Sequence, residues 1–177
     1  MPEIMTLRPT PFPKSRIQAI LDQHEIMVNH YAREYFAHPR FVTEQAEETI
    51  LTIVSLREIG LEHGATLAEI SRQIEKKGFL PCLANTGLFL RLAWKHQQQS
   101  NNSILMGTHD APDQAVMVFS ELLERDDAFP KGLYLRNVNG QLWLRGYTCD
   151  SLYRFPADAM FAIGMPNTYG QSQNEGT

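Results

Sequence analysis

The feature that most constrains the fold of this chain is the dipeptide Asn139-Gly140, which separates two runs of mostly alternating polar and apolar residues. A two-residue type I′ turn requires positive φ at both central positions, and Asn-Gly adopts these angles readily. The sequence therefore predicts a β-hairpin over residues 132–147, in a register that places Arg136 opposite Trp143.

This register sorts the hairpin side chains onto two faces, because successive residues of a strand point to opposite sides. One face carries four leucines and is assigned to the core: Leu133, Leu135, Leu142 and Leu144. The other face carries aromatic and arginine side chains: Tyr134, Arg136, Trp143, Arg145 and Tyr147. Trp, Tyr and Arg dominate interaction hot spots, so this face is a candidate ligand- or partner-binding surface. Two structural interpretations compete: the arginines stack on the aromatic rings across the strands, or a helix covers the face.

The size and composition of the chain indicate one globular domain. It has 177 residues, of which 43% are hydrophobic and 20% charged, enough for a sizeable core. The formal net charge of −4 argues against a nucleic-acid partner, because phosphate contacts usually come with an excess of Lys and Arg. No stretch approaches the roughly 20 apolar residues of a membrane helix, and the proline-rich N-terminus does not resemble a secretory signal. We therefore expect a soluble, cytoplasmic protein without membrane association.

The first half of the chain shows the periodicity and end signals of helices. The third of these is the best defined, because Thr66 and Glu69 fit a capping box and Gly78 fits a terminating glycine. The fourth is apolar almost all round, so we place it near the centre of the core. Four helices are expected, over residues 15–37, 43–60, 66–78 and 86–97.

The second half changes to strand signals around one further helix. We expect a buried strand over 103–108, a helix that begins at Asp110 and includes 115–123, the hairpin, and a last strand near 159–163. The expected fold class is α+β: about four N-terminal helices, then a strand–helix–hairpin–strand unit that forms a small, mainly antiparallel sheet. The expected organisation is an extended arm over 1–13, a single domain over 14–164 and a disordered tail over 165–177. Within that domain we distinguish a helical half, 14–98, from an α/β half, 103–164.

No combination of residues identifies a reaction, so catalytic residues stay unknown at this point. Cys82 and Cys149 lack the Cys/His spacing of zinc sites, and we expect neither a metal nor a cofactor. His24, Tyr31 and His38 follow at seven-residue steps, but about 10 Å of helix separates successive steps, too much for the two histidines to share an ion. No nucleophile elbow and no phosphate-binding glycine loop occurs.

Three hypotheses about function remain. The first is a non-catalytic binding or regulatory protein that acts on a protein or small-molecule partner through the aromatic–arginine face of the hairpin. The second is a nucleic-acid-binding regulator in which residues 66–97 form a helix-turn-helix-like unit, although the connection is long and the second helix is mostly apolar. The third is an enzyme with a pocket where helices meet the sheet, around His109, Asp110 and Cys149. A homodimer is one arrangement that would cover the edge of a short sheet.

Overall fold

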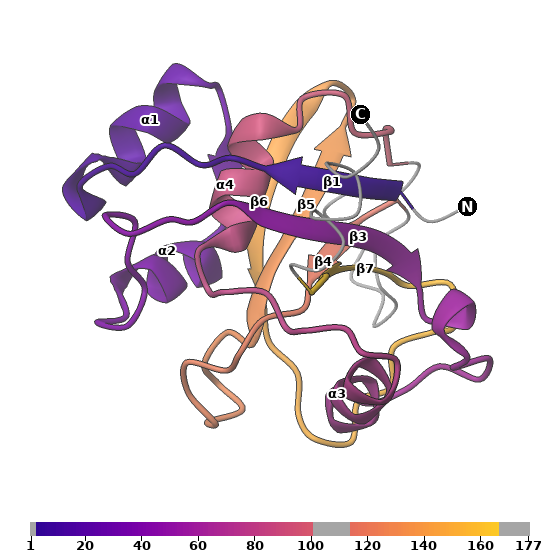
Figure 1. Cartoon of the computed structure of the whole chain (residues 1–177). Helices are drawn as coiled ribbons and strands as arrows, with labels where there is room; N and C mark the ends of the chain where they lie inside the picture. The colour runs from indigo at the N-terminus through magenta and orange to yellow at the C-terminus, as the bar shows by residue number, and fades with distance from the viewer. Residues whose placement is uncertain (1–2, 101–113, 167–177) are drawn as a thin grey trace.

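The computed structural model describes residues 3–100 and 114–166, which form one mixed sheet flanked by helices (Figure 1). The seven strands of these residues lie in the order β1–β3–β7–β4–β5–β6–β2. The strands are β1 (Glu3–Leu7), β2 (Met27–Val28), β3 (Thr49–Ser55), β4 (Val116–Val118), β5 (Gly132–Val138), β6 (Gln141–Tyr147) and β7 (Met160–Gly164). The α-helices are α1 (Ile17–Gln23), α2 (His30–Ala37), α3 (Leu67–Lys76) and α4 (Thr86–Ala93). Two 3-10 turns are η1 (Lys14–Arg16) and η2 (Arg57–Ile59).

The expected small, mainly antiparallel sheet behind four N-terminal helices is wrong. The described part of the chain has a seven-stranded sheet in which β2 pairs parallel with β6 and β4 pairs parallel with β7. Helices and strands are interspersed along the chain, so the fold is mixed α/β. Residues 3–7, which we expected in an extended arm, form an edge strand paired antiparallel with β3.

Two of the expected helices contain central strands instead. The helix expected over 43–60 contains β3, and the helix expected to include 115–123 contains β4. Val116, Met117 and Val118 are all buried, and four consecutive residues of β3 are buried as well. A strand buried on both faces reads as a continuous apolar run and lacks the alternation that reveals a half-buried strand. The strand expected over 103–108 lies outside the described residues.

The long helix expected over 15–37 is interrupted by β2. Glu25 adopts a positive φ of 55° after α1, and the next residues join the edge of the sheet beside β6. Asn29 then caps α2, because its side chain accepts a hydrogen bond from Ala32 N at 2.9 Å. The same side chain bonds both backbone groups of Gly146 in β6, so it joins α2 to the sheet. A tertiary contact therefore divides what the periodicity predicts as one helix.

The local predictions with specific turn or cap residues are confirmed. The hairpin pairs in the predicted register, with Arg136 opposite Trp143, and Asn139 and Gly140 both have positive φ. Helix α3 begins with the predicted capping box of Thr66 and Glu69.

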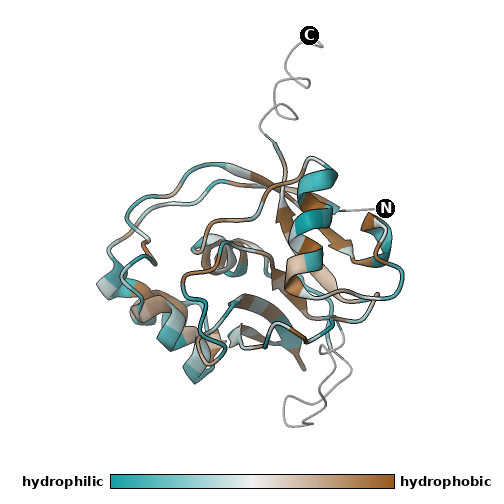
Figure 2. Ribbon diagram, turned by 90° about the horizontal axis from the view of Figure 1, so that it is seen from below, coloured by the Kyte–Doolittle hydropathy of each residue, from teal (hydrophilic) through white to brown (hydrophobic). Residues whose placement is uncertain are grey.

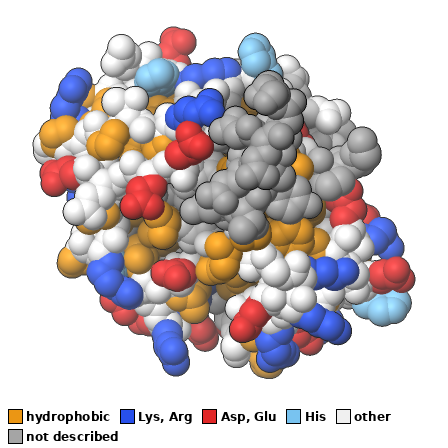
Figure 3. Space-filling view, viewed as in Figure 1, with side chains coloured by type: hydrophobic (Ala, Val, Ile, Leu, Met, Phe, Trp, Pro, Cys, Tyr) orange, Lys and Arg blue, Asp and Glu red, His pale blue; other side chains and the backbone are white. Residues whose placement is uncertain are grey.

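Two apolar clusters occupy the two sides of the sheet. The first joins α1, α2 and α4 to the hairpin leucines Leu133, Leu135 and Leu144. The second joins α3 and the 148–159 connection to the opposite face, where Met117 and Phe161 lie. In Figure 2 the strands are largely apolar in colour, and hydrophilic residues gather on the peripheral helices and loops. Figure 3 shows exposed charges of both signs interspersed with hydrophobic side chains on one face.

We predict that Gly146 tolerates no side chain, because α2 lies directly against it. A Cβ at this position would be 2.6 Å from Tyr31 C and 2.8 Å from Ala32 N, which are backbone atoms that cannot rotate away. Gly146→Ala should lower the free energy of unfolding by about 3 kcal/mol or more. Gly78→Ala is the control: its Cβ would meet nothing within 4 Å, but φ is +79°, so strain alone should cost about 1–2 kcal/mol. Urea unfolding measures the free energy of unfolding of both variants. A smaller loss of stability in Gly146→Ala than in Gly78→Ala would contradict the prediction.

A second prediction concerns Glu69. The Thr66 backbone N–H donates to the Glu69 carboxylate at 2.9 Å, and the Arg154 guanidinium lies 3.0 Å from the same carboxylate. The hydrogen bond from Thr66 is the larger of the two effects, and both lower the pKa of Glu69 below the ordinary 4.5. A depressed carboxylate pKa stabilises the fold above pH 4.5, and this contribution is lost as the pH falls below that value. Glu69→Gln should therefore destabilise the protein more at neutral pH than in acid. Urea unfolding at the two pH values is the measurement. Glu75→Gln, on the same helix, is the matched control, and an equal pH dependence there would refute the assignment to Glu69.

Candidate functional site

A pocket of about 970 Å³ lies at one end of the sheet, between α3 and the loop that follows β4. Strands β4 and β6 are both antiparallel to β5, so their carboxyl ends meet at the same edge. The volume is in the range of small-molecule sites. The wall comprises these residues: Leu67, Ala68 and Ser71 of α3, Phe119 to Arg125, Asp127 and Lys131 around the loop, Tyr147 at the end of β6, Cys149 to Ser151 after it, and Arg40 and Pro81.

Five of the lining residues are more than nine-tenths buried, and we call them the pocket floor: Phe119, Ser120, Leu123, Lys131 and Tyr147. The exposed lining residues include four acids and two arginines, which form a rim of mixed charge: Glu121, Glu124, Asp127, Asp150, Arg40 and Arg125. The floor thus combines apolar side chains with three polar groups, the pattern by which ligand sites fix the orientation of a bound molecule.

Tyr147 contributes a phenol to the pocket floor. Its hydroxyl makes no hydrogen bond to any of the described residues. Burial raises its pKa well above the usual value, so the phenol keeps its proton. The ring reaches its position because residue 132 is glycine: a Cβ there would lie 3.1 Å from the Tyr147 oxygen. The hydroxyl is not among the fully buried side-chain atoms without a partner, so it is accessible from the pocket.

Ser120 is the second polar group of the floor. Its Oγ lies 3.3 Å from the hydroxyl of Tyr35, which is fully buried. Burial raises the pKa of Tyr35 to about 12, so this phenol is protonated and can donate to Ser120. The Ser120 proton is then left for an acceptor in the pocket.

Lys131 is the third polar group, and it is 5% exposed. Its ammonium donates to two backbone carbonyls, Asp126 O at 2.8 Å and Glu124 O at 3.5 Å. Within residues 3–100 and 114–166, no carboxylate oxygen lies within 4.0 Å of it. A buried ammonium is usually paired with an opposite charge, and here only peptide dipoles hold it.

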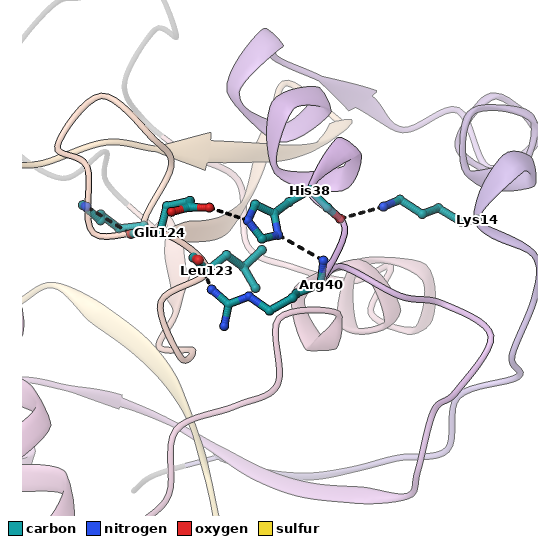
Figure 4. A network of polar contacts seen from close by, with 6 residues as sticks. Lys14, His38, Arg40, Leu123 and Glu124 are labelled. Atoms are coloured by element: carbon teal, nitrogen blue, oxygen red, sulfur yellow. Dashed lines mark hydrogen bonds and ion pairs between the residues drawn. The ribbon is translucent and has the colours of Figure 1, made fainter.

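A network of hydrogen bonds holds the part of the pocket wall beside Lys131 (Figure 4). His38, just after α2, approaches Glu124 Oε1 with Nε2 at 2.7 Å and accepts the Arg40 N–H at Nδ1 at 3.0 Å. Because Nδ1 is the acceptor, Nε2 carries the proton and donates to Glu124. The Arg40 guanidinium donates to Leu123 O, and the Lys14 ammonium to His38 O. Both ring nitrogens are occupied, so the imidazole ties α2 to the loop and has no free nitrogen for proton transfer.

Cys149 lines the pocket, whereas His109 and Asp110 lie outside the described residues. Its thiol is half-buried, and burial raises its pKa to about 11 although the charge of Lys131 acts in the opposite direction. Cys82 is fully buried with a pKa raised to about 12 by burial, and both cysteines are free. Neither thiol has the depressed pKa of an activated nucleophile.

The hairpin face divides into separate environments. Tyr134, Trp143 and Arg145 are half-buried and interact with one another: Arg145 Nε donates to the Tyr134 hydroxyl at 2.8 Å, and its guanidinium lies 5.1 Å from the Trp143 ring centre. Arg136 is 2% exposed and donates to Ser100 Oγ. Tyr147 is the member of this face that lines the pocket.

The other sequence candidates lie elsewhere. Helices α3 and α4 are consecutive, but residues 86–91 of α4 are buried, so this helix offers few side chains to a nucleic-acid groove. His24 follows α1 and lies 3.0 Å from the Lys95 ammonium, and His38 belongs to a separate helix end. Within the described residues, no three His, Cys, Asp or Glu side chains gather as metal ligands. None of the helices described has the length and apolar composition to cross a bilayer.

Neither Ser120 nor Lys131 was predicted from sequence as a binding residue. We expected residues 115–123 in a helix, with Ser120 on the helix surface. The end of strand β4 was therefore not recognised. Lys131 immediately precedes the hairpin, and an isolated lysine at the start of a strand normally indicates a solvated residue. No local pattern marks either residue.

Because Cys82 is more deeply buried than Cys149, we predict that the Cys149 thiol reacts first. With Ellman's reagent at about pH 8, Cys149 should react slowly because only a small fraction is thiolate, and Cys82 should react only after denaturation. Cys149→Ser should abolish reaction of the folded protein. Release of two equivalents of thiol without denaturant would show that the described burial of Cys82 is wrong.

Comparisons with protein-family models, with characterised proteins and with solved structures found no significant match to this chain.

Proposed function

We propose that this protein is a non-catalytic small-molecule-binding protein whose ligand occupies the pocket between α3 and the loop after β4. The observation that carries the proposal is the pocket floor. Lys131 and Tyr147 are both more than nine-tenths buried, yet the ammonium has no carboxylate partner and the phenol no hydrogen bond among the described residues. A bound molecule that supplies acceptors would pair with the ammonium and take the place of solvent at the accessible Tyr147 hydroxyl.

Three properties of the site support binding over catalysis. The His38 ring uses both nitrogens in structural hydrogen bonds. The Cys149 thiol has a raised pKa. The Ser120 hydroxyl is paired with a tyrosine rather than with a base. Nucleophilic catalysis needs a nucleophile with an adjacent base or a lowered pKa, and these residues supply neither.

The pocket is also a better candidate than the exposed part of the hairpin face. Arg145 is engaged by Tyr134 and Trp143, so a partner would have to compete with contacts that already exist. A protein partner on that face stays a separate hypothesis from sequence.

The proposal predicts that filling the pocket abolishes ligand binding. Ala68 is an exposed α3 residue that lines the pocket, so Ala68→Trp should place an indole in the pocket without disturbing the core. Ala19→Trp, at an exposed alanine of α1 outside the pocket, is the matched control. Saturation-transfer NMR with a library of small molecules is the measurement, with circular dichroism to check the fold.

We expect a set of compounds that bind the wild type and Ala19→Trp but not Ala68→Trp. Binding that survives in Ala68→Trp places the ligand elsewhere and contradicts the proposal. The absence of any binder to the wild type in a broad library also counts against it.

A further inference from the structure

We propose that Asn139 is a site of spontaneous deamidation, and that the nearby Asn137 sets the rate of this reaction in the folded protein. Asn139-Gly140 is the only Asn-Gly dipeptide of the sequence, and both of its residues are exposed. The Asn139 side chain makes no hydrogen bond to the residues that the structure describes. This modification is independent of the pocket and of its ligand.

Deamidation at this position is an intramolecular substitution. The Gly140 nitrogen loses its proton to hydroxide and attacks the side-chain carbonyl carbon Cγ of Asn139, and glycine has no side chain to hinder this approach. The N–Cγ bond forms, the Cγ–Nδ2 bond breaks, and the nitrogen leaves as ammonia after it takes a proton from water. Water then adds to one of the two carbonyls of the resulting succinimide ring. Ring opening gives either an aspartyl or an isoaspartyl residue at position 139.

The folded hairpin holds the attacking nitrogen in a hydrogen bond. The Gly140 N–H donates to Asn137 Oδ1 at 3.0 Å, so the proton that must leave is already engaged by an acceptor. The acceptor is itself fixed, because Asn137 is 8% exposed and its Nδ2 donates to Gln97 O at 2.8 Å. The Asn137 side chain therefore opposes the first step of the reaction.

The turn conformation opposes the second step, which is closure of the ring. Asn139 and Gly140 have φ of 53° and 86°, as in a type I′ turn, where ψ of the first central residue is about +30°. At this ψ the Gly140 nitrogen points away from the Asn139 side chain, so the ring closes only after the turn opens. A Cβ on Gly140 would meet nothing within 4 Å, so the turn can open locally without unfolding of the domain. The hydrogen bond to Asn137 must break in this opening.

The isoaspartyl product would change the hairpin, because its backbone runs through Cβ and Cγ and so lengthens a two-residue turn. Hairpin register depends on turn type and loop length. The pairing of Val138 with Gln141 and the hydrogen bond from Gly140 to Asn137 are therefore expected to be lost in the product. The modified chain should unfold at a lower urea concentration than the unmodified chain.

The experiment follows position 139 in the folded chain during incubation at mildly alkaline pH. Trypsin cleaves after Arg136 and Arg145 and so releases residues 137–145 as one peptide. Fragmentation of this peptide in the mass spectrometer measures the conversion of the amide to the acid at position 139. The same peptide made by synthesis gives the rate without tertiary structure. Hydrogen exchange of the Gly140 amide, measured by NMR, reports the hydrogen bond to Asn137 directly.

We expect the wild-type chain to convert more slowly than the free peptide. Asn137→Ala should convert about threefold to tenfold faster than the wild type, the effect of losing one hydrogen bond. Asn137→Asp keeps an acceptor oxygen and should stay close to the wild-type rate. Gly78→Ala destabilises the fold outside the hairpin, and it should leave the rate unchanged because the opening at Asn139 is local.

Several results would overturn the inference. Equal rates in the wild type and the free peptide would show that the fold gives no protection. Equal acceleration by Asn137→Ala and Gly78→Ala would show that the reaction requires global unfolding. Fast conversion of Asn137→Asp would assign the effect of Asn137→Ala to lost packing. If Asn137→Ala does not fold, the wild-type Gly140 amide decides: slow exchange supports the role of Asn137, and rapid exchange rejects it.

Discussion

The structure depends on β4, a strand of only three residues. Val116 and Met117 pair antiparallel with β5, and all three residues pair parallel with β7, so β4 joins the hairpin to the β1–β3–β7 part of the sheet. Val116 and Val118 lie in one apolar cluster and Met117 in the other. A short strand with both edges paired and both faces buried contributes to both cores, and its loss would separate the sheet into two parts. The pocket floor begins immediately after it, at Phe119.

Arg91 and Lys131 are both buried cations without a carboxylate partner among the described residues, and their surroundings differ. The Arg91 side chain is fully buried at the end of α4 and donates to Gln97 Oε1 and Trp94 O. Burial lowers the pKa of Arg91 to about 10, and its Nε has no partner among the described residues. Arg91 does not line the pocket, so its environment serves the fold. Lys131 is also held by carbonyls, but it borders the pocket. Functional sites commonly retain polar groups that a purely structural core would satisfy.

The sequence allowed local parts of the fold to be predicted. The hairpin register follows from Asn139-Gly140, and it placed Tyr147 on the face opposite the leucines. Cys149 was named as a junction residue. The capping box of α3 follows from Thr66 and Glu69. Ser120 and Lys131 could not be found, because their importance comes from burial at the end of β4, a strand that periodicity assigned to a helix.

What the sequence by itself determined is therefore the set of features whose causes are local: a turn that needs positive φ, a helix cap and the alternation of one hairpin. The tertiary structure alone decided that residues 49–55 and 116–118 are central strands, that β2 and β4 pair in parallel, and that α3, the loop after β4 and the end of β6 enclose a pocket. The physical reason is that burial on both faces removes the periodic signal of a strand. A pocket built from segments as far apart in sequence as Leu67 and Tyr147 is specified only by the packing that brings them together.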